Sequence, residues 1–372
     1  MSSFNISSVG SWVKKIFPNL RKTQSNNLSL GVLGMVKARS GLMSEIVREV
    51  PGALKHKHRL KRFWRFVSNS RVNTNSLKIT WCSWVVKTFV PGKYIVVALD
   101  WTELPGNIQC LMAAMPFGGR AIPLLWVITT YRDYKDSQNR IEERLVTSLT
   151  QIIPREKKII LVADRGFGRA SLINHLLGLN LLFCLRVKAD VVITTQIQKI
   201  ATNQTRKQKI NLRQLKIKVG QVKWFKAISY RQDGIVKKVN LAVTLAAPKV
   251  GEESDPWLLV TNLRKASTAI SHYQLRFDIE EWFKDLKHQL DISKLQTRNV
   301  DRVRRLVFIS AVSYGLLMLI GSLTQRFKSI QDRLITGRGK AASRIWFALR
   351  IIEHQLLDPI YWRKIWTKAK GP

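Results

Sequence analysis

Apolar residues follow a helical period in the first part of the chain and form strand-like runs in the next part. In Asn5–Leu20 and Ser40–Leu54 the apolar side chains recur with a period near 3.6 residues, which predicts helices. Lys55–Val67 interleaves basic residues with aromatic residues and is predicted to be a third helix. From residue 91 the pattern changes to short β-branched runs, so residues 1–90 are predicted to form a helical region.

The pattern between residues 91 and 187 predicts a sheet with interspersed helices. The predicted strands are Tyr94–Asp100, Ile108–Met115, Ile122–Thr130, Lys158–Ala163 and Leu181–Val187. The predicted helices are Asp136–Ile152 and Gly168–Leu177, and a turn at Phe117–Gly119 joins the second strand to the third. Three strands followed by alternating helices and strands resemble the RNase H-like fold, an α/β fold with a mixed sheet. Strand order alone does not establish any chemistry.

The helical period disappears again between residues 188 and 262. Leu215–Val219, Trp224–Tyr230 and Lys237–Thr244 have the pattern of further strands, which predicts a β-rich insertion. The predicted division of the chain is a helical basic region, a first core segment, the β-rich insertion, a second core segment and a helical C-terminal part, at residues 1–90, 91–187, 188–262, 263–325 and 326–372.

The charge of the chain points to a polyanionic partner. Its 63 Lys and Arg residues face 24 Asp and Glu residues, which leaves a formal net charge of +39. Nucleic acid is the polyanion that such a surface fits best, although a membrane or ribosome surface is an alternative. Sixteen of the basic residues lie in residues 1–90, against two acidic ones, and twelve lie between Arg186 and Arg231. Both regions are predicted to face DNA; a solvated helix face is the alternative for the first.

Cysteine content and hydropathy bear on the location of the protein. Three cysteines without paired spacing argue against a disulfide framework and a cysteine zinc site, and they fit a reducing cytoplasm. The first residues lack the apolar run of a secretory signal. Leu306–Thr324 contains 19 uncharged residues and is either a membrane span or the central helix of a soluble core. Its small polar residues and basic flanks favour the core helix, which predicts a cytoplasmic, nucleoid-associated protein without membrane contact.

Two aspartates follow strongly apolar strands. Asp100 ends the run VVALD and Asp164 ends the run ILVAD, and each is followed by a polar turn. Carboxylates at the ends of neighbouring buried strands converge, and such oxygen ligands are those that Mg²⁺ prefers. The alternative is that each aspartate only caps a turn.

The segment Tyr273–Lys287 carries a stripe of polar residues if it forms one helix. At 100° per residue, Arg276 lies about 40° from the direction of Glu280, and Tyr273 and Lys287 each lie about 20° from it. Glu281 is rotated by about 100° and is predicted to point elsewhere. The stripe is suited to an acid that holds metal beside groups that hold phosphate; a ladder of salt bridges is the alternative.

These residues resemble the signature of a known family. Tyr273, Arg276, Glu280 and Lys287 match the Y-(2)-R-(3)-E-(6)-K pattern of the insertion-sequence-4 family of bacterial transposases. The resemblance covers roughly residues 90–325 and also includes the aspartate motifs. It implies an RNase H-like core with a β-rich insertion between Asp164 and the glutamate, consistent with the 116 positions that separate them.

The resemblance also implies a mechanism and roles for individual residues. Asp100, Asp164 and Glu280 would be catalytic and would hold two Mg²⁺ ions, with Mn²⁺ as a substitute. Tyr273, Arg276 and Lys287 would bind DNA phosphate. Trp257 would stack on a flipped base, with core packing as the alternative. The expected activity is cut-and-paste transposition through a hairpin intermediate, by a homodimer on paired terminal inverted repeats that then joins target DNA. A catalytically inactive or domesticated DNA-binding relative is the alternative.

Overall fold

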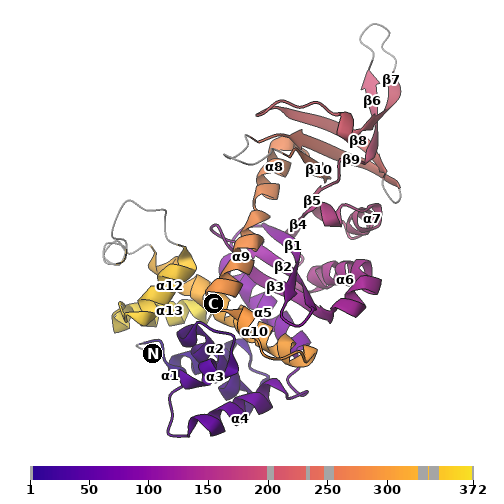
Figure 1. Ribbon diagram of the computed structural model, residues 1–372. Helices are drawn as coiled ribbons and strands as arrows, with labels where there is room; N and C mark the ends of the chain where they lie inside the picture. The colour runs from indigo at the N-terminus through magenta and orange to yellow at the C-terminus, as the bar shows by residue number, and fades with distance from the viewer. Residues whose placement is uncertain are drawn as a thin grey trace.

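The computed structural model describes residues 3–198, 205–231, 235–246, 255–325, 334 and 343–370. Figure 1 shows three tiers: α-helices at the bottom, a mixed sheet flanked by helices in the middle, and a group of long strands at the top. Both ends of the chain lie among the lower helices. The buried apolar residues form one hydrophobic cluster that extends from Phe4 to Ala369.

Five helices precede the sheet. They are α1 (Ile6–Ile16), α2 (Lys22–Ala38), α3 (Met43–Arg48), α4 (His56–Val67) and α5 (Thr74–Phe89). The side chain of Asn5 caps α1 and that of Asn73 caps α5, because each accepts hydrogen bonds from backbone N–H groups of the first turn. The helix predicted at Ser40–Leu54 is shorter than expected, since only six residues of it are helical. The buried indoles of Trp12 and Trp84 both donate to the carbonyl of Ala369, which joins this region to the C-terminal end.

The middle tier is a mixed α/β arrangement. Its strands are β1 (Tyr94–Leu104), β2 (Ile108–Pro116), β3 (Ala121–Thr130), β4 (Lys158–Ala163) and β5 (Leu182–Arg186). They lie side by side in the order β3-β2-β1-β4-β5. β1 is antiparallel to β2 and parallel to β4, and β4 is parallel to β5. This large mixed sheet is compatible with an RNase H-like core. The predicted turn between β2 and β3 is present, with Gly118 and Gly119 at positive φ.

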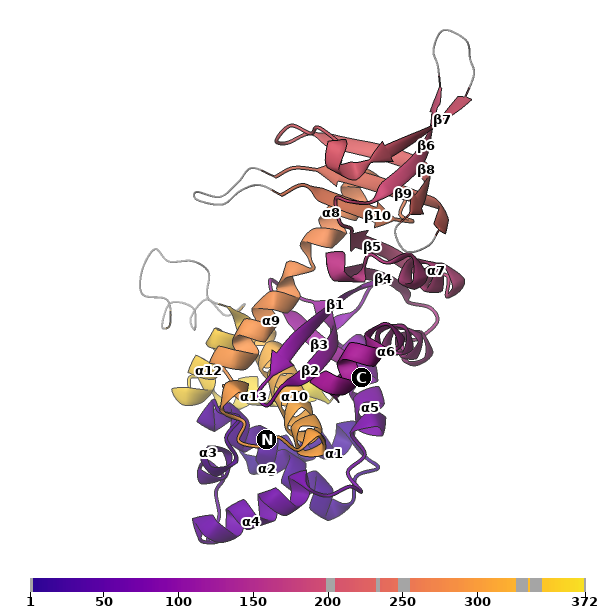
Figure 2. The ribbon, with the colours of Figure 1, turned by 45° about the vertical axis from the view of Figure 1, so that its right-hand side comes forward.

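Helices cover both faces of this sheet. On one side lie α6 (Tyr131–Ile152) and α7 (Ala170–Gly178), and on the other side lie α8 (Ala266–Gln274) and α9 (Phe277–His288). Successive side chains of a strand point to opposite faces, so each residue of β1 meets one of these two layers. Figure 2 shows α9 running diagonally along the left side of β1, β2 and β3, which it contacts.

The upper tier extends the same sheet. Its strands are β6 (Val192–Gln198), β7 (Thr205–Asn211), β8 (Val222–Arg231), β9 (Ile235–Thr244) and β10 (Trp257–Thr261). They continue from β5 in the order β10-β9-β8-β6-β7, which gives one ten-stranded sheet. The strand predicted at Leu215–Val219 is wrong: within the described residues it pairs with no neighbouring strand and leads into a turn at Gly220. Alternation without a pairing partner does not make a strand.

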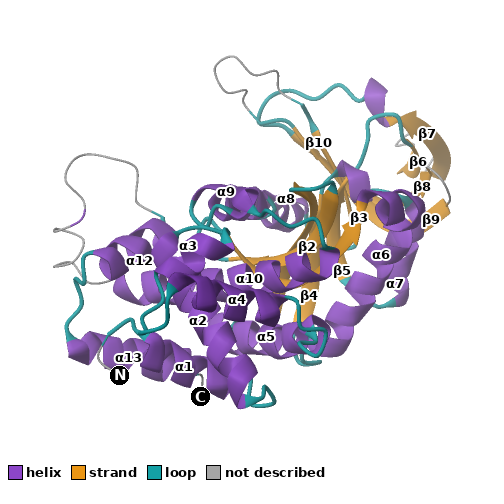
Figure 3. Ribbon diagram, turned by 60° about the horizontal axis from the view of Figure 1, so that its bottom comes forward, coloured by secondary structure: helices purple, strands orange, loops and turns teal. Residues whose placement is uncertain are grey.

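One apolar helix occupies the centre of the lower tier. Helix α10 (Val300–Thr324) is long and apolar enough to cross a membrane, yet 89% of its most apolar window is buried inside the protein. It packs against α2, α5, α12 (Arg344–Glu353) and β3, and Figure 3 shows it surrounded by helices. Such burial is typical of a core helix. The last helix, α13 (Pro359–Ala369), packs against α1 and α10.

Candidate active site

Asp100 and Asp164 lie side by side on neighbouring parallel strands. The last residue pair between β1 and β4 is Leu99 with Ala163, and each aspartate is the next residue of its strand. Asp164 therefore directly follows the end of β4, as predicted. Asp100 does not end its strand: β1 continues to Leu104, because the antiparallel partner β2 pairs with it beyond the point where β4 stops. The two aspartates lie close together, as the sequence predicted, at the point where the parallel pairing of β1 with β4 ends.

The segment that was predicted to be one helix is divided in two. Helix α8 ends at Gln274 and α9 begins at Phe277. Around the junction the backbone N–H groups of Leu275 and Arg276 bond three residues back, to His272 and Tyr273 respectively, which tightens the turn. Tyr273 thus belongs to a different helix from Glu280, and the angular phase between them is not that of one continuous helix.

Arg276 stands between two of the acids. Its Nη2 lies 2.5 Å from Oε1 of Glu280, and its Nη1 lies 3.6 Å from Oδ2 of Asp100. The guanidinium is only 5% exposed and stacks on the ring of Phe277, 4.5 Å from its centre. Asp164 also interacts electrostatically with Arg276. One arginine is therefore surrounded by the three carboxylates that the sequence singled out.

Burial and neighbouring charges shape the titration of Asp100. Burial raises the pKa of this carboxyl to about 6, and the nearby Arg276 guanidinium opposes the rise. Asp164 and Glu280 push the pKa upward, since a second negative charge close by disfavours ionisation. The three carboxylates are thus near enough to one another to disfavour each other's ionisation.

The donor set fits a hard divalent cation. Three carboxylates from β1, the end of β4 and α9 supply oxygen atoms, which Mg²⁺ and Mn²⁺ prefer as ligands. In the present side-chain arrangement, no three His, Cys, Asp or Glu residues of the described chain stand close enough together to hold a metal ion. Arg276 lies between Asp100 and Glu280, so joint ligation by these two acids requires its guanidinium to move.

Two other charged residues of α9, Glu281 and Lys287, differ in their ion pairs. Glu281 pairs with Arg120 at 3.2 Å and with Lys284 at 2.6 Å, so its carboxylate is directed away from Asp100. Lys287 is exposed and, among the described residues, forms no ion pair. It lies two turns after Glu280 on the same continuous helix, about 20° from the direction of that residue. A free cation therefore stands on the same helix face as the acid.

Aromatic side chains border the site on the side of β10. The ring of Trp257 lies 5.0 Å from that of Tyr273 and 5.8 Å from that of Phe277. Tyr273 is fully buried, and burial raises its pKa to about 12 although Arg276 and Arg186 oppose the shift. Within the described residues its hydroxyl makes no hydrogen bond of ordinary geometry. Phe277, whose ring also contacts that of Tyr273, is 38% exposed.

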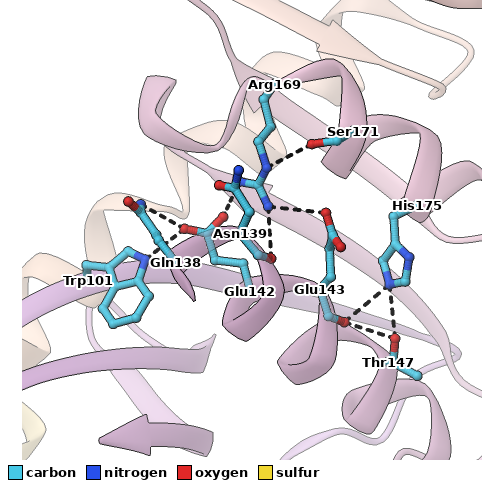
Figure 4. Close-up of polar contacts among 9 residues, drawn as sticks. All are labelled: Trp101, Gln138, Asn139, Glu142, Glu143, Thr147, Arg169, Ser171 and His175. Carbon is cyan, nitrogen blue, oxygen red and sulfur yellow. Dashed lines mark hydrogen bonds and ion pairs between the residues drawn. The ribbon is translucent and has the colours of Figure 1, made fainter. Parts of the chain in front are cut away.

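Behind the strands, a buried polar network joins the segments that carry the two aspartates (Figure 4). Its centre is Glu142 of α6, whose side chain is 0% exposed. One carboxylate oxygen accepts from the Trp101 indole at 2.8 Å and from Gln138 at 3.0 Å. The other pairs with Arg169, which also bonds the hydroxyl of Ser171 at 3.0 Å.

The network ties both aspartates to a common support. Trp101 is the residue after Asp100, and Arg169 lies five residues after Asp164 in the loop that leads into α7. Glu142 thereby links β1 to the loop after β4 from the opposite face of the sheet. Sequence reasoning missed this residue, although a signal exists: the glutamate lies on the apolar stripe of α6, three, four and seven residues before Leu145, Val146 and Leu149.

Comparison with known proteins identifies the region that contains this site. No curated protein matches the chain. A family model described as "Transposase DDE domain" matches residues 91–316, more than half of the chain. The matched residues include β1, β4 and α9 and therefore all three acids. The chain belongs to the transposase DDE domain family.

Proposed function

We propose that this protein is a cut-and-paste transposase of the insertion-sequence-4 family whose catalytic residues are Asp100, Asp164 and Glu280. The observation that carries the proposal is the grouping of these acids around Arg276, in a chain whose family acts in DNA transposition. Hard oxygen donors in this number suit two Mg²⁺ ions, with Mn²⁺ as a substitute. When bound, such ions activate water and stabilise the attacking and leaving oxygens of a phosphodiester.

The remaining residues of the site bind and orient DNA. Arg276 releases the carboxylates and takes a substrate phosphate, for which its planar fork of donors is suited. Lys287 supplies a second, exposed cation on the same helix. The Tyr273 hydroxyl is influenced by Arg276, Asp164 and Arg186, which supports a contact to the same phosphate. Trp257 borders these residues and is positioned to stack on an unpaired base.

The substrate in this proposal is the pair of terminal inverted repeats of an insertion sequence, and then target DNA. Each end is nicked, the new 3′-hydroxyl closes a hairpin on the opposite strand, and the reopened end joins the target. A homodimer on two paired ends performs these steps together. The net charge of +39 supports strong binding to a polyanion. A relative that binds DNA without cutting it is the second candidate, but the grouped acids favour an enzyme.

A cleavage assay tests the proposal directly. The terminal repeats are sought in the DNA that flanks the coding sequence, and end-labelled duplexes containing them are incubated with the protein and Mg²⁺ or Mn²⁺, with a chelator as control. Native and denaturing gels separate nicked, hairpin and flush-ended products. We expect the three species to appear in this order. Binding without cleavage in either metal would support the inactive relative, and cleavage without a hairpin would refute the hairpin route.

A further inference from the structure

A polar cleft lies at the outer edge of the sheet, beyond β3. It has a volume of about 440 Å³ and is enclosed by the first turns of α5 and α10 and by the backbone of β3. We call it the β3-edge cleft. The side chains that give it charge are Lys78, Asp301, Arg304 and Arg305. None of these residues has a part in the site described above.

Positive charge in this cleft is only partly balanced. Arg304 pairs with Asp301 at 2.8 Å, but Lys78 donates to the carbonyl of Trp126 at 2.7 Å. Arg305 likewise donates to backbone carbonyls, those of Val67 and Asp301 among them. A carbonyl satisfies a donor without cancelling its charge. With their ordinary ionisation, the three cations Lys78, Arg304 and Arg305 and the single carboxylate of Asp301 give the cleft a net charge of about +2.

Lys78 is the most unusual of these residues. It is 9% exposed, and within the described part of the chain no carboxylate forms an ion pair with it. Burial lowers its pKa to about 8, and Arg304 adds to the effect while Cys110 opposes it. An ammonium has three N–H donors, and one of them is used by Trp126. Burying a charge without a counter-charge is costly, so an anion in the cleft would relieve the cost.

The register of the sheet places the cleft close to the acids. Asp100 pairs with Met112 of β2, and Met112 pairs with Trp126 of β3, so the three residues lie at one level across the sheet. Neighbouring strands are about 4.8 Å apart, which puts β3 about 10 Å from Asp100. Phosphates of one DNA strand follow each other at about 3.4 Å along the helix axis. Successive phosphates are farther apart than this axial rise, because the strand also winds around the axis, so the separation corresponds to about three nucleotides at most.

We propose that the β3-edge cleft binds a phosphodiester of the DNA substrate, within about three nucleotides of the phosphate that reacts at the acids. The inference rests on the proposed function, because it takes DNA as the substrate of that site. Lys78 contributes the buried charge and Arg304, which is 46% exposed, reaches the phosphate from the rim. The contact fixes the strand at a second point, so that the reacting phosphate cannot slide past the acids.

The test compares two matched arginine variants in DNA binding without divalent metal. Arg304→Gln removes a cation that pairs with an acid three residues away, and Arg350→Gln removes one with the same kind of pair, to Glu353, on α12. Lys78→Met is a second variant, used if thermal melting shows that it folds. We expect Arg304→Gln and Lys78→Met each to reduce the salt dependence of binding by about one phosphate contact, a change of about 0.9 in the logarithmic slope. Arg350→Gln should leave the slope unchanged.

Neutral methylphosphonates placed one at a time along the DNA locate the contact. Wild-type protein should lose affinity at a position within about three nucleotides of the cleaved bond, and Arg304→Gln should be insensitive at that position. A slope equal to that of wild type in both cleft variants would overturn the inference. So would stabilisation of wild type by inorganic phosphate with no change in DNA binding, which would mark a site for small anions only. Cleavage is measured in a separate assay with Mg²⁺, so the two proposals can fail independently. If the cleft does not bind DNA, the proposed cleavage activity can still be observed. If the protein does not cut the substrate, the salt dependence of binding still tests the cleft.

Discussion

The same two strands have an arginine–carboxylate centre on each face, and the two centres differ in exposure. Behind β1 and β4, Glu142 is 0% exposed and Arg169 is 10% exposed, and both have several partners. In front, Arg276 is 5% exposed but faces Glu280 at 43% and Asp100 at 24%. Within the described residues, the Nε atom of Arg276 is buried without a hydrogen-bond partner.

The difference in exposure indicates that the rear centre has a fixed set of partners, whereas the partners of the front centre can be exchanged. A buried, fully bonded pair resists change, because removing either partner leaves a charge stranded away from water. The front centre has water on its carboxylate side and spare capacity on its arginine, so its partners can be replaced by metal and phosphate. We infer that the rear pair holds the strands in place while the front arginine moves between two sets of partners. Four predictions test this contrast, from the largest expected effect to the smallest.

The first concerns the acids of the front centre. Asp100→Asn, Asp164→Asn and Glu280→Gln each keep the size of the side chain but remove the charge that binds divalent metal. We expect DNA cleavage to fall to the background of the assay in all three, with affinity for terminal-repeat DNA close to that of wild type. Gel cleavage assays and fluorescence anisotropy measure the two quantities. Cleavage at the wild-type rate in any one variant would remove that residue from the proposed catalytic set.

The second concerns the rear pair. Glu142→Ala strands Arg169 in a buried position, which should lower the free energy of unfolding by about 3–5 kcal/mol. Glu143→Ala is the matched control: this neighbour lies 3.6 Å from the same arginine but is 30% exposed, so its loss should cost about 0–1 kcal/mol. Chemical denaturation measures both. In the folded fraction of Glu142→Ala, Mn²⁺ affinity measured by calorimetry should fall by about 10–100-fold. Equal stability of the two variants would contradict the distinction between the faces.

The third concerns the cations of the front centre. Arg276→Ala and Lys287→Ala should still make the first nick, because that step requires the acids and water. Both should accumulate nicked DNA, since closing the hairpin requires two strands held in line and a misplacement of about 1 Å costs about a hundredfold. Time courses on end-labelled DNA resolve the species. If the first nick were lost as completely as in Glu280→Gln, these residues would belong to the metal site itself.

The fourth prediction is the smallest and serves as a control on α9. Glu281→Gln removes a charge paired with Arg120 and Lys284 at the surface, where such pairs contribute about 0–1 kcal/mol. Cleavage should stay within about threefold of wild type, because such a change alters the barrier by well under 1 kcal/mol. A cleavage defect comparable to that of Glu280→Gln would show that the two adjacent glutamates had been assigned the wrong roles.

The sequence predicted the elements that bury apolar side chains, because burial imposes a period on the residues. Lys158–Ala163 forms a strand with the predicted bounds, and Asp164 follows it as expected. The grouping of Asp100 with Asp164 and Glu280 was also foreseen from the apolar strands and the family signature. The assigned roles of these residues, like the domain boundaries and the contacts of Trp257 with DNA, stay predictions.

The features that the sequence did not predict depend on partners far away in the chain. Leu215–Val219 alternates like a strand but has no neighbour to pair with among the described residues. β1 extends beyond Asp100 only because β2 pairs there, and the junction at Leu275 interrupts a segment whose periodicity is helical throughout. Glu142 was overlooked because its burial depends on pairing with Arg169, which lies 27 residues later in the chain and is brought close to it only by the fold.

The ten-stranded sheet has a mechanical consequence. Backbone hydrogen bonds run without a break from β7 to β3, so a force applied to the upper strands is transmitted to β4, the strand that precedes Asp164. As between β6 and β8, only three residue pairs join β5 to β10, with Leu259 and Arg186 at one end of this seam. Asn262 reinforces this seam by bonding to both Leu181 and Phe183. Such a force must therefore cross this seam, one strand away from β4.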